Sequence, residues 1–126
     1  RTYGYTTAMP SALAYAVMQS LTLLEQEEWR REKLARLITL LKSHYQSSRW
    51  SLLPSLTPIQ PLLIGESNTA IQLSEILRRE GILIPAIRPP TVPVGQARLR
   101  ISLSASHREE EIIQLAETLQ RAERMI

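Results

Sequence analysis

The fold of this chain is decided by residues 88–105, RPPTVPVGQARLRISLSA, where a proline-rich loop leads into a strand of strict alternation. Successive side chains of a strand point to opposite faces, so every second residue shares a face. The apolar set is Ala97, Leu99, Ile101, Leu103 and Ala105, and the polar set is Arg98, Arg100, Ser102 and Ser104. One face therefore belongs to the core. The plain interpretation of the other face is solvated arginines on a half-exposed strand.

The loop before this strand contains Pro89, Pro90 and Pro93. Proline fixes φ, lacks a backbone donor and biases the preceding residue toward extended geometry. We therefore expect residues 88–94 to form a stiff connector. Such a connector can hold polar side chains in register with the strand that follows.

Helical periodicity dominates the first third of the chain. Pro10 is well placed as the first residue of a helix. Apolar residues recur at helical spacing through residues 13–24 and, after a charged break, through residues 34–45. This pattern predicts two helices or one long bent helix. Residues 50–53 then suit a short edge strand after a connector rich in serine and proline.

The second half alternates strands with helices. Residues 59–64 are a predicted strand ended by Gly65, and Asn68 is a predicted N-cap. A helical stripe follows and closes at Gly81, before a short predicted strand at residues 82–84.

The last element is a predicted amphipathic helix. Ser106 and Glu109 have the spacing of a capping box, and Glu109, Glu110 and Glu111 suit the positive end of a helix dipole. The order of elements is helices, strand, helix, strand, strand, helix. It predicts an α/β (α+β) small domain in which a sheet of about three to four strands is covered by helices.

Composition excludes several classes of protein. The chain has 126 residues and no cysteine, which removes disulfides, thiolate catalysis and cysteine zinc sites. No apolar run approaches the roughly 20 residues needed to cross a bilayer. The net charge is +3, but the basic residues are mixed with glutamates, as in EQEEWRREKLAR, so we expect no nucleic-acid partner. The chain begins at Arg1 without a methionine and runs straight into patterned sequence, so we expect a fragment. Because it has no membrane span, no signal-peptide pattern and no cysteine, we expect the protein to be cytoplasmic.

Few side chains suit catalysis. We expect His44 and His107 to be surface residues and predict no metal site, because no ligand spacing repeats. The glycines are isolated, so no phosphate-binding loop is present. The chain has no aspartate, and its two lysines, Lys33 and Lys42, lie in the charged helical region.

Two stretches resemble a known family. RPPTVP followed by ARLR, and YTTAMPSALA at residues 5–14, are similar to the C-terminal part of the α-oxoamine synthases, pyridoxal-phosphate enzymes of the aminotransferase-like fold (fold type I). The resemblance covers essentially the whole chain. It implies that residues 1–9 end the large cofactor-binding domain and that residues 10–126 form the small C-terminal domain with its connecting helix.

The resemblance also implies roles for individual residues. Arg100 matches the arginine that binds the carboxylate of the amino-acid substrate, and Thr91 matches a loop residue that contacts substrate. Thr91 could instead be a turn hydroxyl that bonds locally. Thr7, favoured over Thr6, would reach the cofactor phosphate of the partner subunit in a homodimer, although the next residue is alanine where relatives often have serine. Arg88 and Arg98 are interpreted as structural or rim charges.

The resemblance implies a complete enzyme that condenses L-alanine with a pimeloyl thioester, with loss of carbon dioxide, in biotin biosynthesis. The thiol carrier, coenzyme A or a carrier protein, is left open. The cofactor would be pyridoxal 5'-phosphate, held mainly by the preceding domain, so this chain would hold no catalytic residue and would be inactive alone. One alternative is another α-oxoamine synthase that uses glycine. An alternative of a different class is a non-catalytic interaction module derived from this domain, and the coding sequence before Arg1 would distinguish them.

Overall fold

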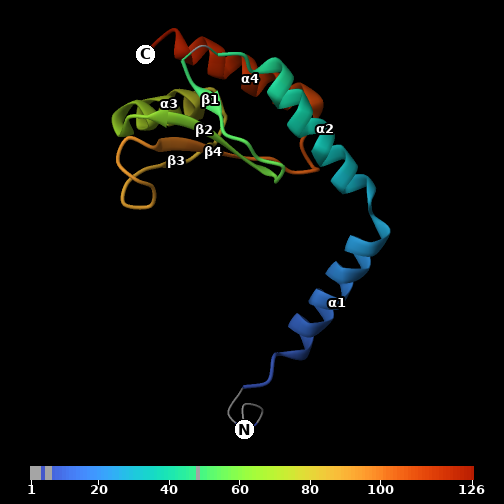
Figure 1. Cartoon of the computed structure of the whole chain (residues 1–126). Helices are drawn as coiled ribbons and strands as arrows, with labels where there is room; N and C mark the ends of the chain where they lie inside the picture. Colours follow the sequence, from blue (N-terminus) through green and yellow to red (C-terminus); the bar gives the residue numbers. More distant parts are fainter. Residues whose placement is uncertain (1–3, 5–6, 48) are drawn as a thin grey trace. The chain divides into compact units, whose positions relative to one another are not determined.

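A computed structural model describes residues 4, 7–47 and 49–126 of the chain (Figure 1). It divides into two compact units, Arg1–Arg31 and Glu32–Ile126. In chain order the elements are α1 (Ser11–Gln26), α2 (Trp29–His44), β1 (Ser51–Leu52), β2 (Ile59–Gly65), α3 (Ser67–Arg79), β3 (Ala86–Ile87), β4 (Ala97–Ser102) and α4 (Glu109–Glu123).

The first helix begins one residue later than predicted. Pro10 is the N-cap of α1, and its carbonyl accepts hydrogen bonds from the backbone N–H groups of Leu13 and Ala14 at 3.0 and 3.1 Å. Proline suits this position because an N-cap needs no backbone donor of its own. None of the sixteen residues of α1 is buried.

Two helices, rather than one bent helix, occupy the N-terminal third. The N–H of Glu27 donates to the carbonyl of Leu23 and ends α1. α2 begins two residues later with Trp29, and the carboxylates of Glu27 and Glu28 pair with Arg30 and Arg31 in its first turn. These exposed pairs fix the start of α2 only weakly, since surface ion pairs contribute little free energy.

The four strands form one antiparallel sheet in the order β1-β2-β4-β3. This confirms the predicted sheet of three to four strands and the edge strand near residues 50–53. β2 and β4 are the central pair, with Leu62 opposite Leu99 and Leu63 opposite Arg98. A register shift between Leu63 and Gly65 makes a bulge where β2 ends, and Gly65 has φ +92°.

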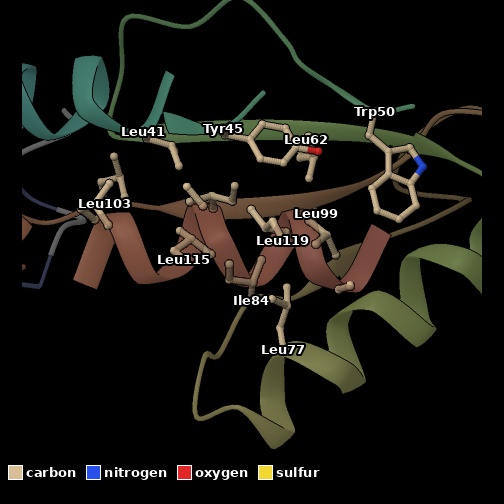
Figure 2. Close-up of a cluster of buried hydrophobic side chains, with 14 of the residues drawn as sticks. Leu41, Tyr45, Trp50, Leu62, Leu77, Ile84, Leu99, Leu103, Leu115 and Leu119 are labelled. Carbon is tan, nitrogen blue, oxygen red and sulfur yellow. The ribbon is translucent and has the colours of Figure 1, made fainter. Parts of the chain in front are cut away.

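The sheet has one covered face and one open face. Side chains from α2, α3 and α4 meet Leu62, Leu99, Ile101 and Leu103 in a single buried cluster (Figure 2). Directly opposite residues of an antiparallel pair share a face. The opposite side, here called the open face, therefore carries Pro61, Leu63, Ile87, Arg98 and Arg100. The alternation predicted for residues 97–104 is confirmed, because Ala97, Leu99, Ile101 and Leu103 are buried whereas Arg100, Ser102 and Ser104 are exposed.

Both predicted N-caps in the second half of the chain are wrong. The N-cap of α3 is Glu66 rather than Asn68, and its carboxylate accepts from the N–H groups of Asn68 and Thr69 at 2.9 and 2.6 Å. These bonds lower the pKa of Glu66 below its usual value, because they favour the charged carboxylate. A glutamate can thus replace the shorter cap that the sequence suggested.

At the last helix the N-cap is Arg108 rather than Ser106. Ser104 and His107 bond to each other through both a backbone and a ring contact, which closes a turn before the helix can begin. The carboxylate of Glu111 then accepts from the N–H of Arg108 at 2.8 Å. That bond is the largest cause of the lowered pKa of Glu111, because it favours the charged carboxylate.

The strand predicted at residues 82–84 is also wrong, since the pairing with β4 involves β3 at Ala86–Ile87. Residues 82–84 are held by α3 instead. The N–H of Ile82 donates to the carbonyl of Leu77, and the hydroxyl of Ser74 donates to the carbonyl of Ile84 at 2.6 Å. Pairing starts only where the N–H of Arg100 reaches the carbonyl of Pro85.

Candidate substrate-binding site

The open face presents two arginines of β4 in different states. Arg98 lies centrally, opposite Leu63 on β2 and Ile87 on β3, and is half-buried. Its Nε donates to the carbonyl of Gln96 and its Nη2 donates to Oε1 of Gln96, each at 3.1 Å. Both bonds go to one neutral residue, so the side chain is already engaged.

Arg100, two residues further along β4, is exposed and lies opposite Pro61. Among residues 4, 7–47 and 49–126 its guanidinium has no hydrogen-bond or ion-pair partner. Only its backbone is engaged, through the bond to Pro85. A free guanidinium fork matches the geometry of a carboxylate, to which it can make two parallel charged hydrogen bonds. Arg100 therefore can receive a carboxylate ligand.

Thr91 lies in the loop that joins β3 to β4. The N–H of Thr91 donates to the carbonyl of Arg88 at 3.0 Å, which closes a turn around the cis peptide bond between Pro89 and Pro90. Thr91 is exposed, and in the described part of the chain its hydroxyl has no hydrogen-bond partner. The alternative that this hydroxyl serves only a local turn therefore has no support in the observed bonds.

Thr91 and Arg100 thus belong to one hairpin, but no cavity of the described residues holds both. A cavity of about 400 Å³ lies where residues 80–85 diverge from β4, with Arg100, Leu103 and Ile112 among its lining residues. Thr91 does not line it. In the described part of the chain the two predicted substrate residues are therefore exposed on one hairpin and do not line a common pocket.

The predicted phosphate contacts lie in the other unit. Thr7 is exposed and precedes α1. Thr6 lies outside the described residues. Both assignments stay predictions.

The described residues do not form a cofactor site of their own. Lys42 donates to the carbonyl of Ser55 at 2.7 Å, and Lys33 is a half-buried residue of α2. The chain contains no aspartate to pair with a pyridine nitrogen. That another part of the protein supplies the pyridoxal phosphate chemistry stays a prediction.

The two histidines also have structural partners. Nδ1 of His107 accepts the N–H of Ser104 at 3.1 Å, and Nδ1 of His44 lies 3.1 Å from the carbonyl of Leu40. In the described part of the chain no three histidine or acidic side chains are grouped as metal ligands. Likewise, no helix found among those residues has the length and apolar character that crossing a bilayer requires.

Comparison with known families assigns the chain. The aminotransferase class I and II family matches residues 1–119, which is most of the sequence. The chain belongs to this family. This membership agrees with the fold-level resemblance and accounts for the four-stranded sheet covered by helices.

Curated relatives with high identity to this chain are 8-amino-7-oxononanoate synthases. The chain is 58% identical over 119 residues to an 8-amino-7-oxononanoate synthase from Nitrosomonas europaea, covering 94% of this chain and 31% of the relative. It is 50% identical over 120 residues to the enzyme of the same name from Pseudomonas syringae, covering 95% of this chain and 30% of the relative. The chain therefore spans about a third of the length of the curated relatives that it matches.

Solved structures show the same fold. An 8-amino-7-oxononanoate synthase from Francisella tularensis superposes with a TM-score of 0.80 at 29% identity, covering 96% of this chain and 35% of that one. A serine palmitoyltransferase from S. paucimobilis, solved with a bound PLP-myriocin aldimine, gives a TM-score of 0.84 at 22% identity, covering 96% of this chain and 31% of that one. At that identity the second likeness concerns the fold alone.

The hydrogen bonding of Arg98 to Gln96 was not predicted. The signal was present, since Gln96 lies two residues before Arg98 and so on the same side of an extended chain. Nothing in the alternation said that the arginine would turn back to it.

Proposed function

We propose that this chain is the C-terminal part of a pyridoxal-phosphate enzyme that condenses L-alanine with a pimeloyl thioester, with loss of carbon dioxide, to give 8-amino-7-oxononanoate for biotin biosynthesis. The 8-amino-7-oxononanoate synthases that are 50–58% identical to this chain support it. The proposal includes a homodimer that acts in the cytoplasm, without nucleic-acid or membrane partners.

The observation that carries the proposal is the free guanidinium of Arg100 on the open face. Two charged hydrogen bonds to the alanine carboxylate would fix the rotation of the substrate about its bond to the nitrogen. That orientation selects which bond at the α-carbon is set for cleavage. The exposed hydroxyl of Thr91, on the adjoining loop, would contact the same substrate from the side.

Pyridoxal phosphate, when bound, supplies the electron sink for breaking bonds at the α-carbon. The lysine that carries it, and the aspartate that pairs with its ring nitrogen, belong in this proposal to the part of the protein that precedes this chain. Thr7 would add a hydroxyl donor to the cofactor phosphate of the partner subunit. Arg100 holds the substrate and Thr7 holds the cofactor, so the chain orients both without performing the chemistry.

The test uses the complete protein that contains this chain. It is incubated with pyridoxal phosphate, pimeloyl-CoA and either L-alanine or glycine, and the products and carbon dioxide are quantified by mass spectrometry. We expect 8-amino-7-oxononanoate and an equal amount of carbon dioxide with alanine. Faster turnover of glycine would favour the alternative synthase, and no turnover of either amino acid would favour the interaction module.

A further inference from the structure

Arg98 makes two hydrogen bonds to Gln96, and the proposed substrate contacts do not account for them. We propose that Arg98 is a positioning residue. Through Gln96 it holds the C-terminal end of the loop formed by residues 88–96, and so places Thr91 relative to Arg100. This inference rests on the proposed function, in which Thr91 and Arg100 touch the same substrate.

The first support is the geometry of the contact. The Nε and Nη2 atoms of Arg98 donate to the carbonyl oxygen and to Oε1 of Gln96, each at 3.1 Å. The guanidinium is planar and its donors keep a fixed spacing. Two bonds from one rigid group to the backbone and side chain of one residue restrict both the rotation and the displacement of Gln96.

The second support is that Arg98 is itself well anchored. Its backbone lies in the middle of a sheet, with β2 on one side and β3 on the other. Its half-buried side chain lies on the open face between Leu63 and Ile87. Rigid elements hold site residues more precisely than loops do, so the sheet can serve as the fixed reference for the loop.

The third support is that hydrogen bonds within the loop connect its C-terminal end to the residues near Thr91. The N–H of Thr91 bonds to Arg88 and the N–H of Gln96 bonds to Pro93, both within the loop. Gly95, with φ +79°, lies close to the bulge of β2, since a Cβ on Gly65 would be 3.5 Å from the carbonyl oxygen of Gly95. A chain of hydrogen bonds therefore runs from Arg98 to Gln96 and from Gln96 to Pro93, which lies two residues from Thr91.

Because Gln96 is neutral, substitutions at this position can distinguish a positioning role of Arg98 from an electrostatic one. The side-chain amide of Gln96 accepts from Nη2 of Arg98 and leaves the positive charge in place, whereas a carboxylate would accept from the same donor and cancel the charge. If positioning is the role, Gln96→Glu preserves both bonds, whereas Gln96→Met loses the bond to Nη2 and keeps only the bond from Nε to the backbone carbonyl. If the role is electrostatic attraction of an anionic substrate, Gln96→Glu is the more harmful change.

The experiment compares variants of the complete enzyme, with Ser102→Ala as a control on the same face of β4. We expect Gln96→Met and Arg98→Met to lower the catalytic efficiency with alanine by roughly 3- to 10-fold, the range for one or two hydrogen bonds of this kind. The loss should be in KM for alanine more than in kcat. The catalytic efficiencies of Gln96→Glu and Ser102→Ala should remain within about twofold of the unmodified enzyme, since both variants keep the two hydrogen bonds between Arg98 and residue 96.

Coupling to Thr91 is tested in the same assay. In a Thr91→Val background, Gln96→Met should cause almost no additional loss, because the contact that it misplaces is already gone. Full additivity of the two changes would overturn the role proposed for Arg98. So would a loss with Gln96→Glu as large as that with Gln96→Met.

Hydrogen exchange gives a reading that does not depend on alanine turnover. The amides of Thr91, Val92 and Gln96 should exchange several-fold faster in Gln96→Met than in the unmodified protein, and at the same rate in Ser102→Ala. Unchanged exchange rates in Gln96→Met would show that the hydrogen bonds between Arg98 and Gln96 do not hold the loop. If the complete enzyme does not use alanine, the proposed function fails, and the exchange rates still decide whether Arg98 holds the loop.

Discussion

Arg98 and Arg100 lie on the same face of one strand but differ in their hydrogen-bond partners. Arg98 and Arg100 are two residues apart on β4 and point the same way. Arg98 has both bonds with Gln96, whereas Arg100 has no side-chain partner among the described residues. Alternation predicted the shared face, but it could not predict this difference, because the bond depends on the path of the loop before β4.

Replacing Arg100 with lysine tests the assignment of the substrate carboxylate. Arg100→Lys keeps the charge and loses the two-pronged geometry. Losing one charged hydrogen bond is worth about 1.5–3 kcal/mol, or roughly 10- to 150-fold in catalytic efficiency with alanine. The measurement is kcat/KM with alanine varied and the thioester saturating, and cofactor absorbance reports that binding of pyridoxal phosphate is intact.

Arg98→Lys is the matched control for that measurement. It should cost much less than Arg100→Lys, because Arg98 acts through Gln96 and not on the substrate. An equal or larger loss at Arg98 would show that the carboxylate is bound by the other arginine of the pair.

At the scale of elements, periodicity predicted more than capping did. Both central strands and the helices α2, α3 and α4 follow from apolar spacing that burial enforces, whereas α1 follows its spacing without burying a residue. The edge strand near residues 50–53 was also predicted. The caps at Asn68 and Ser106 were wrong because Glu66 and Glu111 reach backbone donors over a longer side chain. The strand at residues 82–84 was wrong because bonds to α3, through Leu77 and Ser74, replace the ladder. These are competitions between local partners that the sequence pattern does not rank.

The cap of α3 should make stability depend on pH. The pKa of Glu66 is lowered by the N–H groups of Asn68 and Thr69, so its charged form is favoured in the folded state. The stabilisation is then complete above the pKa of the unfolded chain, about 4.3, and is lost as pH falls through the lower folded pKa. Glu66→Gln should therefore lower the urea midpoint at pH 7 and have a much smaller effect in acid.

Glu75→Gln, at an exposed position of the same helix, is the control for the cap. It should change the midpoint little at either pH. A destabilisation by Glu66→Gln that stays constant from neutral pH to below the folded pKa would show that the carboxylate charge does not stabilise the cap.

At the scale of the whole molecule, the proposed function assigns substrate and phosphate contacts to this chain and the reactive centre to the rest of the protein. Residues 11–24 of α1 contain no charged residue, and none of α1 is buried. A helix that is apolar on most sides is normally covered by other protein. The relatives are about three times as long as this chain, and the proposed remainder supplies both that cover and the cofactor lysine.

The isolated chain should therefore form no specific covalent adduct with pyridoxal phosphate. Lys42 is engaged by the carbonyl of Ser55, and no aspartate is present to hold the ring. Visible absorbance after addition of the cofactor, followed by borohydride trapping and peptide mass spectrometry, provides the measurement. A single stoichiometric adduct at Lys33 or Lys42 would overturn the assignment of the chemistry to the preceding part of the protein.

The apolar surface of α1 should also make the isolated chain self-associate. Leu13, Met18, Leu21 and Leu24 are each about half exposed or more, and large exposed apolar patches commonly mark sites of association with other protein. Sedimentation should show species that grow with concentration, and the double change Leu21→Gln and Leu24→Gln should reduce them. A sharply monomeric chain at high concentration would favour the interaction module over the enzyme part.

Thr7 should act across the dimer of the complete enzyme. In this proposal each active site combines the lysine of one subunit with Thr7 of the other, so the two lesions can be separated in hybrids. A variant without the cofactor lysine is mixed with Thr7→Val after dissociation of both. The hybrid would then carry one site with both lesions and one site with neither, and activity should rise above that of either parent. If Thr7 instead serves its own subunit, every site keeps one lesion, and the mixture should gain no activity.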